Sequence, residues 1–219
     1  MNVSTKYLFI FILIFSGQYS ISQYSLGGGI TAMSGFDDSP TFVGVNGFYE
    51  APRNELQTFF IRAGLFLPKR FFDETNVEAI DFDNPPTPFV KTVDLQRRTT
   101  LITLDGGNRM YLYNTYDAGL ALYGGINLKG LLATYSERLG EYDETLYQPS
   151  DGVMPRSTSL LLSFGGNIGV KYQLPYRGAL VFDIGLDLIR RMHDPAFILG
   201  NEIAPLSYTI NIGYRFDWF

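Results

Sequence analysis

From Tyr24 onward, apolar and polar residues alternate in eight runs that are separated by segments rich in turn-forming residues. Because successive side chains of a strand point to opposite faces, a period of two predicts β-strands with one apolar face each. No helical pattern of useful length interrupts the runs. The predicted strands cover residues 24–34, 41–51, 57–68, 97–113, 118–136, 158–174, 179–193 and 206–217.

The connections between the predicted strands alternate in length. Short connections cover residues 51–56, 114–117 and 175–178, and the others cover 35–40, 69–94, 137–156 and 194–205. Short turns at one rim and long loops at the other are typical of outer-membrane barrels, whose long loops lie outside the cell. An even number of strands then places both termini on the short-turn side, which is the periplasmic side.

The alternation by itself fits two architectures. A soluble secreted β-barrel turns its apolar faces inward, whereas a membrane barrel turns them toward lipid. Here the apolar faces end in aromatic residues such as Tyr49, Tyr172 and Trp218, and the opposite faces carry glycine and charge. Aromatic residues at both lipid interfaces mark membrane proteins. We therefore predict an all-β, eight-stranded, antiparallel up-and-down transmembrane β-barrel with short periplasmic turns and long extracellular loops, and keep the soluble barrel as the alternative.

Residues 1–22 have the layout of a secretory signal peptide. Lys6 precedes an uncharged run at residues 7–15, and small polar residues follow before Gln23. The run is much shorter than the roughly 20 apolar residues of a membrane-spanning helix. We expect cleavage before Gln23, export, and one barrel domain at 23–219. The chain has no cysteine, so the fold cannot use disulfides, and the lipid-bearing cysteine of a lipoprotein is absent.

The last predicted strand has an apolar residue at every second position: Tyr208, Ile210, Ile212, Tyr214 and Phe216. This pattern resembles the C-terminal signature of bacterial outer-membrane barrels, although three residues follow Phe216 here. The predicted barrel is similar to small eight-stranded proteins of the OmpA/OmpX-like type, and the many Tyr and Phe residues resemble outer-membrane proteins of Bacteroidetes. The resemblance implies an integral protein of a Gram-negative outer membrane, surrounded by lipid and lipopolysaccharide and inserted by the barrel-assembly machinery. It implies no particular activity.

Several charged residues fall on the faces that a membrane barrel turns inward. They are Arg62, Lys129, Lys171, Asp183, Asp187 and Arg215, with Asp105 and Arg109 as further candidates. Eight strands leave an interior just wide enough for side chains or one small ligand. We interpret the set as a polar network that fills the interior. The alternative is a narrow channel for small solutes or ions, favoured by the apparent excess of positive groups on these faces.

Charge and motifs exclude some activities and leave one enzymatic alternative. A net charge of −5 and a pI near 4.9 argue against a nucleic-acid partner. Lipid A acyltransferases and deacylases resemble small barrels and use His with Ser or acidic partners. The chain has His193 followed by Asp194, with Glu202 and Ser207 beyond, but no family motif surrounds His193. We therefore expect no catalytic residues, keep a lipid A-modifying enzyme as the alternative, and expect no metal and no cofactor.

The two longest predicted loops, 69–94 and 137–156, lead to a functional hypothesis. Loops of this length are uncommon unless they have a role or are disordered. Apolar side chains in them offer contacts for a partner: Phe71, Phe72, Phe82, Phe89 and Tyr142. We therefore hypothesise a non-enzymatic, structural or docking and adhesive component of the outer membrane, acting through these loops, alone or as a subunit of a larger envelope complex.

Overall fold

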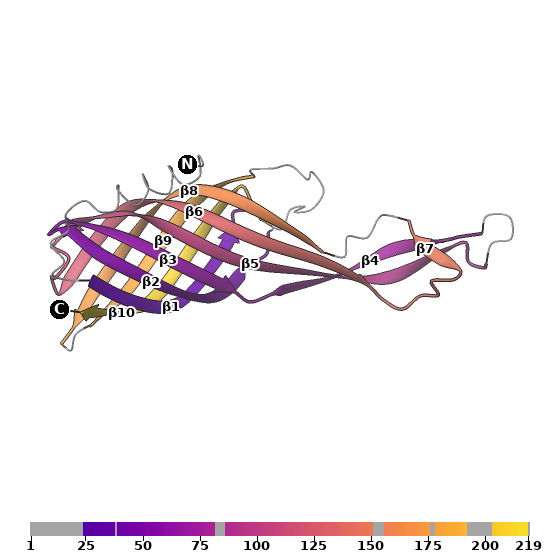
Figure 1. Ribbon diagram of the computed structural model, residues 1–219, viewed down its shortest axis with the longest axis horizontal. Coiled ribbons are helices and arrows are strands. Elements are labelled where there is room, and N and C mark those ends of the chain that lie inside the picture. The colour runs from indigo at the N-terminus through magenta and orange to yellow at the C-terminus, as the bar shows by residue number, and fades with distance from the viewer. Residues whose placement is uncertain are drawn as a thin grey trace, which may run out of the picture.

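A computed structural model describes residues 24–37, 39–81, 86–150, 156–175, 178–191 and 203–218. The predicted signal peptide lies outside these residues. The secondary structure described is a single sheet of ten antiparallel strands (Figure 1). No helix in the described part of the chain is long and apolar enough to cross a membrane. The strands are β1 (Tyr24–Gly35), β2 (Phe42–Asn54), β3 (Gln57–Phe66), β4 (Lys69–Ala79), β5 (Val90–Tyr113), β6 (Leu120–Leu139), β7 (Tyr147–Pro149), β8 (Ser157–Leu174), β9 (Gly178–Arg191) and β10 (Leu206–Trp218).

Eight of these strands close into a ring. Each pairs with its neighbours in the order β1, β2, β3, β5, β6, β8, β9 and β10, and β10 returns to β1. Closure matters because an open sheet would leave unpaired backbone groups at its edges, which lipid cannot satisfy. The eight predicted strands are all present, and the predicted eight-stranded barrel is confirmed.

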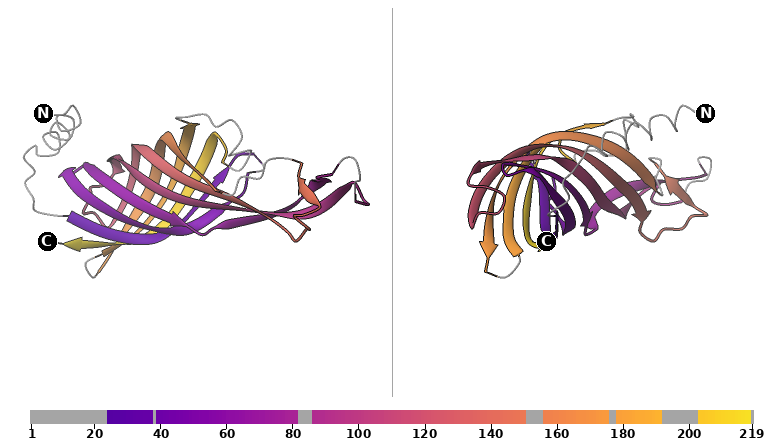
Figure 2. Two further views of the ribbon diagram at one scale, coloured as in Figure 1. Left: turned by 45° about the vertical axis from the view of Figure 1, so that its right-hand side comes forward. Right: turned by 60° about the vertical axis from the view of Figure 1, so that its left-hand side comes forward.

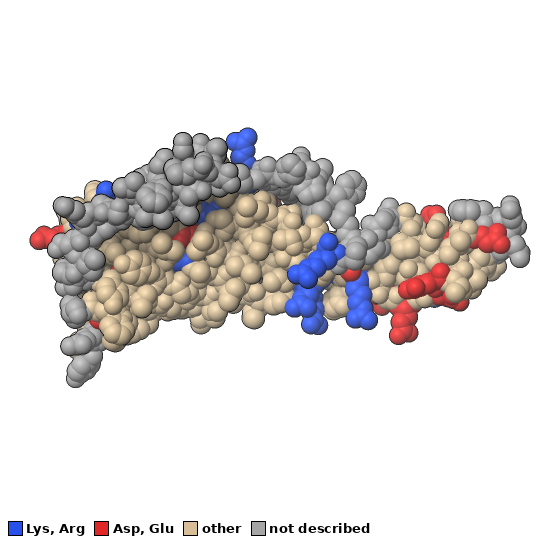
Figure 3. Space-filling view, viewed as in Figure 1, with Lys and Arg blue, Asp and Glu red and all other residues tan. Residues whose placement is uncertain are grey.

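The outer wall of the ring is apolar. In β8, for example, Leu160, Phe164, Ile168 and Tyr172 point outward and are between 54% and 66% exposed. At about 3.3 Å per residue and a tilt of about 40°, the distance from Leu160 to Tyr172 covers roughly 30 Å along the barrel axis, enough to cross the hydrocarbon layer. Charged side chains are scarce on the visible barrel wall in Figure 3. This outward apolar surface excludes the soluble barrel.

An aromatic group marks the end of the wall near the short turns. The rings of Tyr24 and Trp218 stack with centroids 6.3 Å apart, Tyr49 lies 6.2 Å from Tyr24, and Phe216 lies 5.4 Å from Trp218. Register explains the cluster, because Tyr24 is directly opposite Trp218 where β1 meets β10. Such rings suit the boundary between lipid and water, where an apolar body meets a polar surface.

The segment predicted as a loop at 69–94 contains a β-hairpin, so that prediction was wrong in structure. β4 and the beginning of β5 pair from Lys69 with Thr99 to Glu78 with Val90, and they project beyond the ring as an extension (Figures 1 and 2). The 137–156 segment likewise contributes the short strand β7, which pairs with the end of β4. The extension consists of β4, β7 and the adjoining ends of β5 and β6.

The extension has a small apolar core of its own. Val77, Val93 and Tyr147 are buried together, and Leu139 and Tyr142 pack against them. These residues lie on the sheet face that continues the inner face of the barrel, since alternate residues of β5 run from Val93 to the buried Leu101. The extension is therefore a folded continuation of the barrel wall.

Candidate functional site

Ten charged side chains of the described residues are buried in the barrel interior, and Glu50 contacts two of the cations near the short-turn end. Its Oε2 lies 3.1 Å from Arg109 Nη1 and 3.7 Å from Arg215 Nη1, and its Oε1 accepts a hydrogen bond of 2.6 Å from Thr58. The ten are Glu50, Arg62, Asp105, Arg109, Lys129, Lys171, Asp183, Asp187, Arg215 and Asp217.

Asp183 continues the same network toward the middle of the barrel. Its carboxylate lies 2.8 Å from Arg62 Nη2 and 3.3 Å from Arg109 Nη2, and it accepts a 2.7 Å hydrogen bond from Asn211. At the other end, Arg215 Nε lies 2.8 Å from Asp217 Oδ1. The chain of contacts therefore runs without a break from Asp217 to Arg62.

A second group lies further from the short turns. Lys129 forms an ion pair with Asp187, which also accepts a 3.0 Å hydrogen bond from Thr209. Asp105 is directly opposite Arg62 on β3 and directly opposite Lys129 on β6, so the register places it between two cations. Paired and hydrogen-bonded charges avoid much of the cost of burial that isolated ones would incur.

The turn between β5 and β6 folds back into the barrel mouth. Tyr116 in this turn is 3% exposed, hydrogen-bonds with Ser25, and lies under the guanidinium of Arg215 at 4.1 Å from the ring centroid. Its backbone carbonyl accepts a hydrogen bond from Lys171, and its ring packs edge-on to Tyr111. An aromatic plug therefore fills the short-turn end.

The opposite half of the interior contains an apolar cluster. A cluster of buried residues spans the barrel there: Met33, Phe42, Phe66, Leu101, Leu131, Ala133, Leu161, Ile189 and Ile203. A cavity of about 10 Å³ lies between this cluster and the charged network, lined in part by Asn46, Arg62 and Asp105. That volume suits about one water molecule.

The six residues predicted for the interior all point inward and are buried, as are Asp105 and Arg109. The expected excess of positive groups was wrong. Among the described buried residues, five cations face five anions, because Glu50, Asp105 and Asp217 join Asp183 and Asp187. Sequence reasoning missed Glu50 and Asp217. The alternation of side chains along a strand could have found them. Glu50 follows Tyr49 and Asp217 follows Phe216, and both of those aromatic residues were predicted to face lipid, so the next residue must face inward.

The residues of the C-terminal pattern share the outer face of β10. Tyr208, Ile210, Ile212, Tyr214 and Phe216 alternate with the buried or half-buried inward residues of the strand. Trp218 extends the pattern by one position on the same face, with 49% exposure. Recognition of this strand by the assembly machinery stays a prediction.

Most of the catalytic alternative lies outside the described residues. His193, Asp194 and Glu202 lie outside the described residues, and of the four candidates only Ser207 is described. Ser207 is buried in β10, directly opposite Asp187 of β9. It therefore belongs to the barrel interior.

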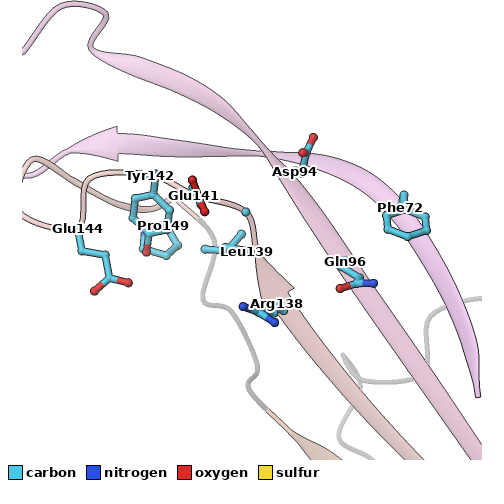
Figure 4. A pocket seen from close by; sticks show the side chains of 10 residues that line it. Phe72, Asp94, Gln96, Arg138, Leu139, Glu141, Tyr142, Glu144 and Pro149 are labelled. Carbon is cyan, nitrogen blue, oxygen red and sulfur yellow. The ribbon is translucent and has the colours of Figure 1, made fainter.

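The extension carries an open groove of about 960 Å³ (Figure 4). Phe72 of β4 and Asp94 and Gln96 of β5 form one side, and Tyr142 and Glu144 come from the segment that connects β6 to β7. The remaining lining residues are Arg138, Leu139, Gly140, Glu141 and Pro149. The groove combines aromatic rings with positively and negatively charged side chains. Such a combination is typical of surfaces that contact another protein.

The predicted loop contacts differ in their surroundings. Phe72 is 77% exposed and Phe89 is 41% exposed, whereas Phe71 is half-buried. Tyr142 packs partly against the core of the extension and also lines the groove. Phe82 lies outside the described residues. The structure therefore brings Phe72 and Tyr142 to one site and leaves Phe71 and Phe89 elsewhere.

The segment that lines the groove is ordered locally by a turn at Asp143. Its carboxylate accepts hydrogen bonds from the Thr145 hydroxyl at 2.6 Å and the Thr145 backbone N–H at 2.9 Å. These bonds favour the ionised carboxylate and hold the pKa of Asp143 below its usual range. The turn therefore carries a negative charge at neutral pH, close to Glu144 and Glu141.

Comparison with known proteins identifies the fold. No family model and no curated protein matches the sequence. The chain is similar to Neisserial surface protein A, with a TM-score of 0.50 and 12% identity over 89% of this chain and 95% of that one. It is also similar to the attachment invasion locus protein Ail of Yersinia pestis, solved with the heparin analogue sucrose octasulfate, with a TM-score of 0.49, 10% identity, and 90% and 98% coverage.

A major outer membrane protein of Thermus thermophilus gives a TM-score of 0.49 and 11% identity over 89% of this chain and 99% of that one. Identities this low show a shared fold only, and a fold hosts many functions. The likeness to the Neisserial protein agrees with the predicted fold, a small eight-stranded antiparallel β-barrel.

Proposed function

We propose that this protein is a non-enzymatic component of the outer membrane that docks a partner outside the cell through the extension. In this proposal both termini face the periplasm, the short turns lie on that side, and the extension stands in the extracellular space. The partner is a protein of the envelope or of another cell surface. The barrel then acts as the anchor, and the extension as the contact element.

The observation that carries this proposal is the exposed Phe72 beside the groove. A phenylalanine that is 77% exposed on a folded sheet gains little from its own protein, whereas aromatic anchors in interfaces contribute much of the binding energy. The extension is also pre-ordered by its core of Val77, Val93 and Tyr147, so a partner would not have to order it. The filled interior gives no comparable support to the channel alternative.

A pull-down of tagged protein from native outer membranes in mild detergent tests the proposal. We expect a stoichiometric partner, and we expect Phe72→Ala to reduce its capture by about 30-fold, the effect of losing an anchor worth about 2 kcal/mol. The matched control is Phe36→Ala, because Phe36 is also exposed, at 62%, but lies between β1 and β2 outside the extension. Recovery of the barrel alone, or equal capture by both variants, would contradict the proposal.

A further inference from the structure

Three exposed arginines lie together where the barrel continues into the extension. Arg70 of β4 is directly opposite Arg98 of β5. Arg138 of β6 is opposite Gln96, which is on the same face of β5 as Arg98 and two residues closer to the tip of the extension. Side chains directly opposite in such pairs have Cβ atoms about 5 Å apart, and diagonal neighbours about 7 to 8 Å. Figure 3 shows basic side chains gathered at this junction and acidic ones further out. We call Arg70, Arg98 and Arg138 the arginine cluster.

The arginine cluster has no acidic partner in the described part of the chain. Arg97, on the other face of β5, lies 3.5 Å from Asp73 and 3.6 Å from Glu137, but no ion pair involves the three arginines of the cluster. Like charges directly opposite each other destabilise a strand pair. An external anion bound here would remove that repulsion.

The depth of the cluster identifies the kind of anion. Going outward along β5, the exposed apolar residues Leu104 and Ile102 are followed by Thr100 and then Arg98 on the same face. Four residues at about 3.3 Å each, with a tilt of about 40°, place Arg98 roughly 10 Å beyond Ile102 along the barrel axis. That is the position of lipid headgroups next to the hydrocarbon layer.

Strand β6 shows the same order of side chains. Leu132 is exposed and apolar, Thr134 and Ser136 follow on its face, and Arg138 comes last. Two neighbouring strands therefore present apolar side chains, then hydroxyl groups, then guanidinium groups at increasing height. A phosphorylated lipid has the complementary order of acyl chains, ester linkages and phosphate.

We propose that the arginine cluster binds the phosphate groups of a lipid in the outer leaflet, while the acyl chains lie against Ile102, Leu104 and Leu132. The planar guanidinium group suits this role because it can donate two parallel hydrogen bonds to a phosphate. The inference relies on the proposed orientation, which puts the extension and this rim on the outside of the cell. The bound lipid would fix the extension relative to the membrane surface.

The test is a titration of bisphosphorylated lipid A into the purified barrel in detergent micelles, with bound lipid counted by native mass spectrometry. The variant Arg70→Gln/Arg98→Gln/Arg138→Gln should bind about 100-fold more weakly, because each basic residue near an anionic lipid contributes about fivefold. The matched control Arg53→Gln/Lys69→Gln/Lys91→Gln removes the same charge. Arg53 lies at the opposite rim of the barrel. Lys69 and Lys91 are on the face of the extension that continues the inner face of the barrel. The control should stay within about twofold of the wild type.

Three results would overturn the inference. The first is equal lipid binding by the arginine variant and the wild type. The second is a loss of lipid binding in the control variant as large as in the arginine variant. The third is displacement of the lipid by excess inorganic phosphate, which would indicate a site for a free anion. Dephosphorylated lipid A should bind as weakly to the wild type as lipid A binds to the arginine variant. Thermal melting provides the check on folding, since removing the like-charge pair should leave the melting temperature unchanged or higher. Because no protein partner is present, failure here leaves the docking proposal intact, and failure of the pull-down leaves this one intact.

Discussion

At the scale of single residues, the interior depends on pairing of charges that would otherwise be costly to bury. Glu50 is the clearest case, because it contacts both Arg109 and Arg215, whose side chains are 1% and 0% exposed. Alternation along the strands predicted which residues face inward, since one face of every strand had to meet lipid. It could not predict which cation meets which anion, because those contacts cross the barrel between strands far apart in the sequence.

The variant Glu50→Gln should therefore lower the free energy of unfolding by about 3 to 5 kcal/mol. It leaves two buried guanidinium groups without their shared carboxylate, and breaking a buried ion pair has that cost. Urea unfolding in detergent micelles, followed by tryptophan fluorescence from Trp218, would measure it. Glu74→Gln provides the control, because Glu74 is exposed on the extension and its replacement should change stability by less than about 0.5 kcal/mol. A loss below about 1 kcal/mol in Glu50→Gln would contradict the pairing described.

At the scale of elements, strand β4 shows where alternation fails as a signal. Its burial pattern has buried residues only at Val77 and Ala79, near one end, because neither lipid nor the barrel interior covers the rest. A strand with water on both faces has no need for an apolar face, so its sequence resembles a loop. The cue that existed was local: β-branched residues on both sides of the proline-rich segment 85–88, as in a hairpin.

The variant Val77→Asp should unfold the extension and leave the barrel folded. A charge placed in the core with Val93 and Tyr147 loses its hydration without gaining a partner. Hydrogen exchange should accelerate in 69–79 and 90–95 and stay unchanged in β8 and β9. Asn76→Asp adds the same charge at an exposed neighbour, where the Thr92 hydroxyl still has an acceptor, and should leave exchange unchanged. Faster exchange throughout the barrel would show that the two parts unfold together.

At the scale of the whole molecule, the closed ring and its contents determine permeability. The short-turn end is filled by Tyr116, the middle by ion pairs, and the other half by an apolar layer that includes Phe42, Phe66 and Leu131. Alternation predicted the ring and its lipid-facing wall. The apolar half of the interior could not be predicted in this way, because in β5 and β6 near that rim both faces are partly apolar and parity no longer separates lipid from lumen.

We expect purified protein to show no steady ion conductance in a planar bilayer. An ion would have to displace paired charges and then pass the apolar cluster, whose hydrocarbon side chains cannot replace its hydration shell. Recordings at symmetric high salt, with a general porin added afterwards to the same bilayer as a positive control, provide the measurement. Stable, unitary current steps from the wild-type protein would contradict the filled interior.

The proposed orientation leads to a labelling experiment that the absence of cysteine makes simple. Single cysteines replace Asp143, in the extension, or Asn114, in the turn between β5 and β6. An impermeant maleimide applied to intact cells should label Asp143→Cys and not Asn114→Cys, and both should react after lysis. The reverse labelling pattern would place the extension in the periplasm.

The continuity of β5 has a mechanical consequence. This strand runs from Val90 in the extension to Tyr113 at the opposite rim, about 80 Å at the usual rise per residue, and it pairs with β6 from Leu95 to its end. A force that pulls the extension along the direction of β5 would shear the hydrogen bonds between β5 and β6. Many of these bonds would then share the force at once. A sideways pull would open the β4 and β7 edge one bond at a time. The molecule should therefore resist traction along β5 far better than bending of the extension.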